Sequence, residues 1–433
     1  MSVDLKSSIS SLLKLSLPII MGQLGQMLIV AGDVFVATKY STEAVAAIGV
    51  ANGFINPLFL FGIGMTMGVS PSFAYFRGKG EDIKDNAMSV LVYSLVLGLL
   101  ISISMLFLNR FIPYFGIDPK IVPGIQAYID IVSWSLPFAL IFGGLKEFLQ
   151  SYEEVFIPNL ISILAVGLNI VVNYLFVFGY ENWNGMGQIG LAWASLSVRI
   201  LLGIVIIFYT FSKFPIGKIK FNVIKVLAKF SLPIAFMFFL EVTAFCTVTI
   251  LSGRLGVVPA ATNNIIMTIA SISFMIPLSL SSAAAVKVGH SFGANNIKDV
   301  FGHTKAIILC TLAFSLFSIL VFGVFPKTIM HFMTQDTAVI DLGIKLLVIV
   351  ALFQVFDAFQ VTLAGVLRGL GETTFPSLMV FLGYWIIGIP SGIYLTFWKG
   401  QGASGLWVGL ALSLAIVAVS LGLFSYKKFK TLV

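Results

Sequence analysis

Three carboxylates lie deep inside apolar stretches of the sequence: Asp33, Glu241 and Asp357. Glu241 stands in the middle of "FFLEVTAFC" (238–246), with no basic residue beside it. An ionised side chain at the centre of a bilayer costs about 3 kcal/mol on insertion scales, and a neutral residue would pack there more cheaply. We therefore interpret these acids as functional groups whose chemistry is the binding of a cation.

Oxygen-bearing side chains accompany the first of these acids. The segment "GLNIVVNYLF" places Asn169 and Asn173 four residues apart, on one face of a helix, and Ser195 follows "GQIG" in the next apolar stretch. A carboxylate, two amide carbonyls and a hydroxyl are the hard oxygen ligands that a small cation such as Na⁺ prefers. The pattern predicts a Na⁺ site formed by Asp33, Asn169, Asn173 and Ser195. Intramembrane asparagines also join helices by hydrogen bonds worth about 1 kcal/mol, so both roles stay open.

A second polar group surrounds the other two acids. "FQVFDAFQVT" places Gln354, Asp357 and Gln360 three residues apart, as a polar stripe on one helix face. With Glu241 these side chains form a candidate site for a cation or a cationic substrate. The candidate cavity walls, which we predict from their proximity to these acids or from the repeat described below, are Gln26, Phe238, Phe353 and Phe356.

Other chemistries find little support in the sequence. The two cysteines, Cys246 and Cys310, lie in apolar segments, which argues against a disulfide framework or a CxxC metal site. The three histidines are not at metal-ligand spacing, and no phosphate loop, HExxH or GxSxG motif occurs. We therefore expect no enzymatic activity and no cofactor other than a coupling ion.

The elements that carry these residues are predicted from composition. The chain of 433 residues is 58% hydrophobic and 10% charged, against about 25% charged in soluble domains. Its first apolar segment lacks a cleavage motif and is long enough to span, so we interpret it as a retained helix. The sequence predicts an all-α, polytopic membrane protein. Its twelve predicted spans are 14–38, 43–75, 88–109, 121–149, 158–179, 188–212, 227–253, 258–288, 304–325, 337–367, 375–397 and 402–425.

The basic residues predict the orientation. With both termini in the cytoplasm, 18 of the 26 lysines and arginines fall on the cytoplasmic side and seven on the other, with Arg199 inside a span. This is a strong positive-inside bias. It also explains the net charge of +8 as a topology signal, so no nucleic-acid partner is expected.

The sequence repeats itself once. "LLKLSLPII" (12–20) returns as "LAKFSLPIA" (227–235), "GQIGLAWAS" (187–195) as "GASGLWVGL" (402–410), and "RGKGEDIKD" (77–85) as "FGANNIKD" (292–299). The nearly constant offset of 215 indicates a duplication of six spans, which makes Gln26 the counterpart of Glu241. We expect an N-lobe (1–211), a cytoplasmic linker (212–226) and a C-lobe (227–433). Because six is even, both halves enter the membrane from the same side, as in transporters built from parallel repeats.

These features resemble the multidrug and toxic compound extrusion (MATE) family. The resemblance covers essentially the whole chain and includes the "SLPI" entries, "AGD" in the first span and "PNLISILAVGLNIVVNYLFVFG". Its most specific part is "FQVFDAFQVTLAGVLRGLGETTFP". The pairing of Glu241 with Asp357 is similar to the NorM-like branch.

The resemblance implies a V-shaped bundle of two six-helix lobes, in the inner (plasma) membrane, that acts as a monomer. It implies export of small cationic or amphiphilic drugs in exchange for Na⁺ or H⁺, by alternating access. The cation-site residues that it implies are Asp33, Asn169, Asn173 and Ser195 in the N-lobe, and Glu241 and Asp357 in the C-lobe. Ser195 stands where Thr is commoner, which retains the hydroxyl. Phe353 stands where NorM-like proteins can have Tyr, which weakens the case for a Na⁺ site in the C-lobe and favours the N-lobe.

Alternative functions remain open. A flippase for lipid-linked oligosaccharides, from the same superfamily, would line its cavity with several cations, whereas Arg199 is the single mid-span cation. A channel is disfavoured by the lobed duplication and by the absence of a filter-like repeat. The sequence leaves open the choice between Na⁺ and H⁺ and the identity of the drugs.

Overall fold

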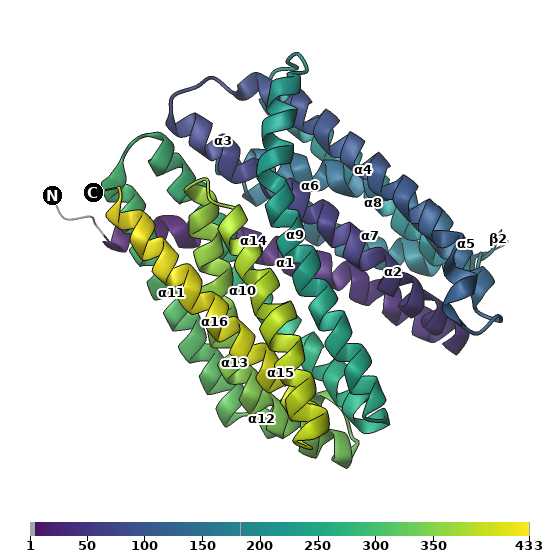
Figure 1. Ribbon diagram of the computed structural model, residues 1–433. Coiled ribbons are helices and arrows are strands. Elements are labelled where there is room, and N and C mark those ends of the chain that lie inside the picture. Colours follow the sequence, from purple (N-terminus) through teal and green to yellow (C-terminus); the bar gives the residue numbers. More distant parts are fainter. Residues whose placement is uncertain (1–4, 182, 433) are drawn as a thin grey trace. The chain divides into compact units, whose positions relative to one another are not determined.

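The computed structural model describes residues 5–181 and 183–432, and nearly all of them are helical (Figure 1). The first half holds α1 (Leu5–Tyr40), α2 (Thr42–Thr66), α3 (Val69–Gly78), η1 (Lys84–Asn86), α4 (Ala87–Asn109), η2 (Ile112–Phe115), α5 (Val122–Ser133), α6 (Leu136–Ser151), α7 (Phe156–Phe178) and α8 (Gln188–Lys213). The second half holds α9 (Phe221–Arg254), α10 (Val257–Gly293), α11 (Ile297–Val324), α12 (Pro326–Met333), α13 (Thr337–Gly369), α14 (Thr374–Val380), η3 (Phe381–Gly388), α15 (Ile389–Ile393), η4 (Tyr394–Trp398) and α16 (Ala403–Lys430). Two short strands, β1 (Gly179–Tyr180) and β2 (Trp183–Asn184), pair antiparallel. The all-α prediction is confirmed.

The number of spans also agrees with the prediction. In the described part of the chain, eleven segments are long and apolar enough to cross a membrane, and the pair α5 and α6 adds a twelfth if it is one span bent by 43°. Pro137 lies at the start of α6, where it leaves the backbone without one N–H donor. The protein is therefore a multi-pass membrane protein, with a bend at the junction of α5 and α6.

Two compact units make up the described structure. Unit 1 contains residues 5–17, 74–81 and 236–432, and unit 2 contains residues 18–73 and the described part of 82–235. Helix α1 therefore begins in unit 1 and continues in unit 2, and α9 begins in unit 2 and continues in unit 1. Packing defines these units, whereas the sequence repeat defines the predicted lobes at 1–211 and 227–433. The predicted lobes remain a proposal about the duplication.

Small residues bring the helices of unit 1 close together. A Cβ on Gly365 of α13 would overlap Ser281 of α10, and one on Gly409 of α16 would lie 2.6 Å from the carbonyl oxygen of Gly388. Between lipid-embedded helices the hydrophobic effect gives little attraction, so close packing of this kind supplies much of the association. Gly365 brings α13 against α10, and Gly409 brings α16 against η3; α13, the helix that carries Asp357, packs against both α10 and α16.

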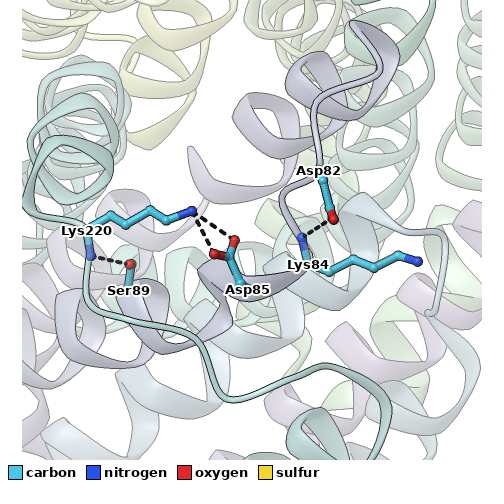
Figure 2. Close-up of polar contacts among 5 residues, drawn as sticks. All are labelled: Asp82, Lys84, Asp85, Ser89 and Lys220. Atoms are coloured by element: carbon cyan, nitrogen blue, oxygen red, sulfur yellow. Dashed lines mark hydrogen bonds and ion pairs between the residues drawn. The ribbon is translucent and has the colours of Figure 1, made fainter.

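The segment that joins α8 to α9 is attached to unit 2 (Figure 2). Lys220 Nζ lies 2.9 and 2.8 Å from the two carboxylate oxygens of Asp85, and its backbone N–H donates to Ser89 Oγ at 2.9 Å. Beside this pair, the backbone N–H of Lys84 donates to Asp82 Oδ1. The side chains of Lys220 and Asp85 are about two-fifths exposed, where an ion pair is worth about 0–1 kcal/mol. The pair therefore sets the path of the linker more than it stabilises the fold.

The ends of α3 and α10 make a reciprocal contact within unit 1. A Cβ on Gly78 would overlap the carbonyl oxygen of His290, and a Cβ on Gly293 would overlap the carbonyl oxygen of Tyr75. Gly78 and Gly293 are 215 residues apart, which is the offset of the sequence repeat. The ring of Tyr75 also lies 5.8 Å from that of Phe292. Equivalent helices of the two halves thus touch through equivalent glycines.

We predict that Gly78→Ala lowers the free energy of unfolding by about 1–3 kcal/mol, because the added methyl overpacks a backbone contact. Gly323→Ala, in α11 of the same unit, is the matched control, since nothing lies within 4 Å of its Cβ. Thermal unfolding of the detergent-purified variants measures the difference. Equal melting temperatures for Gly78→Ala and the wild type would contradict the prediction.

Candidate functional site

Glycines in α1 place Asp33 against α7. A Cβ on Gly25 would lie 3.2 Å from the carbonyl oxygen of Ser162, and a Cβ on Gly32 would lie 3.2 Å from Asn169 Oδ1. Larger side chains at these positions would push the two helices apart. Asp33 follows Gly32 directly and is buried, as are Asn169 and Asn173. The predicted helix face of α7 therefore does meet the first deep acid.

The four side chains predicted for the N-lobe lie together in unit 2, and we call them the Asp33 cluster (Asp33, Asn169, Asn173, Ser195). Asp33 Oδ1 accepts hydrogen bonds from Asn169 Nδ2 at 3.0 Å and Asn173 Nδ2 at 2.6 Å. Asp33 Oδ2 accepts from Ser195 Oγ at 3.2 Å, and Asn173 Nδ2 also donates to Asn169 Oδ1 at 3.0 Å. Three hydrogen bonds therefore offset the cost of burying the carboxylate of Asp33.

Two neighbours of the Asp33 cluster were not among the predicted site residues. Tyr128 of α5, which is buried, interacts with Ser195 and Asp33. Arg199 of α8 interacts electrostatically with Asp33 and donates from Nη1 to Ser135 Oγ at 2.8 Å. The spacing of Arg199 four residues after Ser195 could have indicated this position, because both side chains lie on one helix face.

The C-lobe residues form a second group in unit 1, the Asp357 cluster (Glu241, Gln354, Asp357, Gln360). All four side chains are buried, and Asp357 interacts electrostatically with Glu241. Gln354 Nε2 donates to the carbonyl oxygen of Ala270 at 3.1 Å. Among the described residues, Asp357 Oδ1, Gln354 Oε1 and Gln360 Oε1 have no hydrogen-bond partner. Three acceptor oxygens on one face of α13 are thus left unpartnered, and one of them belongs to the carboxylate that interacts with Glu241.

Tyr384 joins the Asp357 cluster through a π-helical segment. The span from α14 to η4 contains two such segments, η3 and η4, and π-helical turns often occur at functional sites. Tyr384 of η3 donates its hydroxyl to Glu241 Oε1 at 3.5 Å, and Trp385 Nε1 donates to the carbonyl oxygen of Leu240 at 3.1 Å. Sequence reasoning missed Tyr384, because neither hydropathy nor spacing signals a π-helical turn.

Aromatic rings adjoin the Asp357 cluster. The ring of Phe245 lies 6.2 Å from that of Phe353 and 5.8 Å from that of Tyr384, and Phe353 lies 5.3 Å from Trp407. Of the predicted cavity walls, Phe238 and Phe353 are buried, whereas Gln26 and Phe356 are half-buried. Their role in a cavity remains a prediction.

The family model described as MatE matches residues 18–175 and 233–394. The chain is 28% identical over 434 residues to the multidrug resistance protein NorM of Vibrio vulnificus (strain CMCP6), which covers 96% of this chain and 95% of that protein. It is 27% identical over 426 residues to the multidrug resistance protein MdtK of Photorhabdus laumondii, which covers 94% and 93%.

Solved structures share the fold. The eukaryotic MATE transporter AtDTX14 superposes with a TM-score of 0.88 at 20% identity, over 99% of this chain and 98% of that one. A MOP superfamily transporter from Pyrococcus furiosus, reported to have a binding pocket of reverse polarity that suggests a different function, superposes with a TM-score of 0.88 at 18% identity. That match covers 98% of this chain and 96% of the other. At these identities the likeness shows the fold alone.

The hydrogen bonds of the Asp33 cluster lead to a prediction about stability. We expect Asn173→Leu to lower the free energy of unfolding by about 1–3 kcal/mol, because a buried carboxylate loses its shortest hydrogen bond. Asn264→Leu, at an exposed position of α10, is the control and should leave stability nearly unchanged. Thermal unfolding in detergent tests both. A melting temperature of Asn173→Leu at or above that of Asn264→Leu would rule the prediction out.

Proposed function

Because the chain belongs to the MatE family, we propose that it is a secondary transporter that exports cationic and amphiphilic drugs in exchange for Na⁺ or H⁺. The relatives named as multidrug resistance proteins, which match over nearly their whole length, support this proposal. The family consists of transporters, so the protein is not an enzyme. In our proposal it lies in the inner membrane with both termini in the cytoplasm, in line with the bias of its basic residues.

The observation that carries the proposal is the set of unpartnered oxygens in the Asp357 cluster. Buried polar atoms are rarely left without a partner, and each such atom calls for an explanation. Three of them lie on one face of α13, on Gln354, Asp357 and Gln360, and Asp357 interacts electrostatically with Glu241. Within the described residues, no cation acts on Asp357, and a group of acceptors with excess negative charge is suited to bind a cation that arrives from outside.

The aromatic rings fit an organic cation in particular. Faces of Phe, Tyr and Trp attract cations within about 6 Å of the ring centre. The hydroxyl of Tyr384 donates to Glu241, and the ring of Tyr384 packs against Phe245, which in turn packs against Phe353. Apolar aromatic walls accept flat hydrophobic molecules of varied shape with little directional demand. The combination of carboxylates and rings therefore supports a drug site for amphiphilic cations.

Competition between cations for the same acids would couple the two fluxes. A proton or Na⁺ that neutralises a deep carboxylate removes the counter-charge that holds a cationic drug. The drug then leaves on the side where the coupling ion entered, and both need never be bound together. In this mechanism the acids act by charge alone, and the transporter makes and breaks no covalent bond.

We predict that Glu241→Gln and Asp357→Asn each slow the efflux of ethidium at least about tenfold, equivalent to ~1.4 kcal/mol in the barrier. Asp341→Asn changes an exposed acid on the same helix as Asp357 and is the matched control. Efflux is measured in proteoliposomes with Na⁺ and pH gradients imposed separately.

Efflux under the Na⁺ gradient and under the pH gradient distinguishes the possible outcomes. Ethidium efflux by the wild type under at least one gradient is expected, with Asp341→Asn equal to the wild type. No efflux under either gradient would overturn the proposed function. Wild-type rates in both Glu241→Gln and Asp357→Asn would refute the role of the Asp357 cluster.

A further inference from the structure

A polar cavity of about 380 Å³ lies between the end of α4 and the outer half of α5, and it shares no residue with either cluster. Its lining residues, all of which belong to unit 2, are Leu106, Asn109, Arg110, Gln126 and Asp130. Asn109 ends the membrane span that contains α4, and Arg110 follows it directly. The cavity therefore lies where the hydrocarbon of a bilayer gives way to the headgroups. With both termini in the cytoplasm, as proposed above, this is the outer leaflet.

Three hydrogen bonds fix the walls of the cavity. Asn109 Nδ2 donates to the backbone carbonyl oxygen of Gln126 at 3.0 Å and to Asp130 Oδ1 at 2.7 Å. In return, Gln126 Nε2 donates to the backbone carbonyl oxygen of Asn109 at 3.1 Å. The last residue of α4 is thus joined to two successive turns of α5, and the carboxylate of Asp130 is held in place with only one of its oxygens engaged.

Arg110 and Asp130 bring opposite charges to this cavity without pairing. Both line it and both are exposed, yet among the described residues neither side chain takes part in an ion pair. Each charge is therefore available to a ligand. Hydrogen bonds between ionised groups are the strongest that a binding site can offer. A ligand that carries both an anion and a cation would contact both side chains at once.

Apolar side chains lead from the cavity along both helices. On α4, Ile103 and Leu99 precede Arg110 by seven and eleven residues, which is two and three helical turns, so the three lie along one face. On the other side, Trp134 directly follows α5, four residues after Asp130. All three apolar side chains are exposed. A ligand whose charged head occupies the cavity would thus have hydrocarbon contacts on the bilayer side.

We propose that the cavity binds the headgroup of a zwitterionic phospholipid of the phosphatidylethanolamine type. The phosphate contacts the guanidinium of Arg110, whose planar fork of donors suits phosphate oxygens, and the ammonium contacts the carboxylate of Asp130. Phosphoethanolamine also occurs on water-soluble molecules, but the exposed Leu99, Ile103 and Trp134 favour a ligand with acyl chains. The proposal does not depend on the proposed exchange of drugs and ions.

Native mass spectrometry of the detergent-purified protein, titrated with phosphatidylethanolamine, tests the proposal. We expect Arg110→Gln and Asp130→Asn each to weaken binding at least about threefold, a modest factor because contacts between exposed charges are worth little. Arg254→Gln at the end of α9 and Asp341→Asn in α13 remove the same charges from exposed positions outside the cavity. These matched controls should bind the lipid as the wild type does.

Two further ligands distinguish headgroup recognition from a general effect on structure. Phosphatidylglycerol has the phosphate and no ammonium, so Arg110→Gln should weaken its binding and Asp130→Asn should not. Glycerophosphoethanolamine has the headgroup and no acyl chains, so it should not displace phosphatidylethanolamine at equal concentration.

Three results would overturn the proposal. Equal affinities for phosphatidylethanolamine in the wild type, Arg110→Gln and Asp130→Asn would exclude the cavity as a lipid site. An equal loss of both phospholipids in Asp130→Asn would leave Asp130 with a structural role only. Displacement by glycerophosphoethanolamine at equal concentration would show that the ligand is a soluble zwitterion. Since none of these measurements uses ethidium efflux, the proposed function and the lipid site can fail separately.

Discussion

A carboxylate taken out of water must be compensated by hydrogen bonds, by an opposite charge or by a ligand, and this requirement governs both polar clusters. Asp33 receives three hydrogen bonds and interacts with the guanidinium of Arg199. Asp357 lies instead beside a second acid and two amides whose oxygens have no partner among the described residues. One cluster is compensated from within the protein. The other, in our proposal, is compensated by the cation that it binds.

Compensation of this kind requires helices that approach closely, and small residues make that approach geometrically feasible. Gly32 stands next to Asp33 and lies against Asn169, while Gly365 lies against Ser281 two turns from Asp357 on α13. Replacing either glycine by a larger residue would separate the helices whose polar side chains must meet. The hydrogen bonds of the clusters therefore depend on the packing of the spans, because a displacement of about 1 Å between two helices breaks a hydrogen bond.

The sequence predicted the elements better than it predicted the contacts between them. Hydropathy and length defined twelve spans, and the positions of Asn169 and Asn173 on one helix face followed from the helical period alone. The spacing of Arg199 from Ser195 indicates that both lie on one face of α8, but which neighbouring helix that face meets depends on how α8 is rotated, which no local pattern encodes. Tyr384 reaches Glu241 from a π-helical segment. Its wider turn shifts the side chains that follow relative to an α-helical register, so the α-helical period could not have placed it.

Helices α1 and α9 each belong to two units. The boundary between the units lies between residues 17 and 18 in α1 and between residues 235 and 236 in α9. Pro18 and Pro233, the repeated prolines of "SLPI", lie at or within three residues of these boundaries. The start of α1 thus belongs to unit 1, which is formed mostly by the second half of the sequence, and the start of α9 belongs to unit 2, which is formed mostly by the first half. If the chain were cut in the linker, the C-terminal fragment would lack residues 5–17 and the N-terminal fragment would lack residues 221–235. Neither fragment would hold all its packing partners, and the two would have to be present together to restore them.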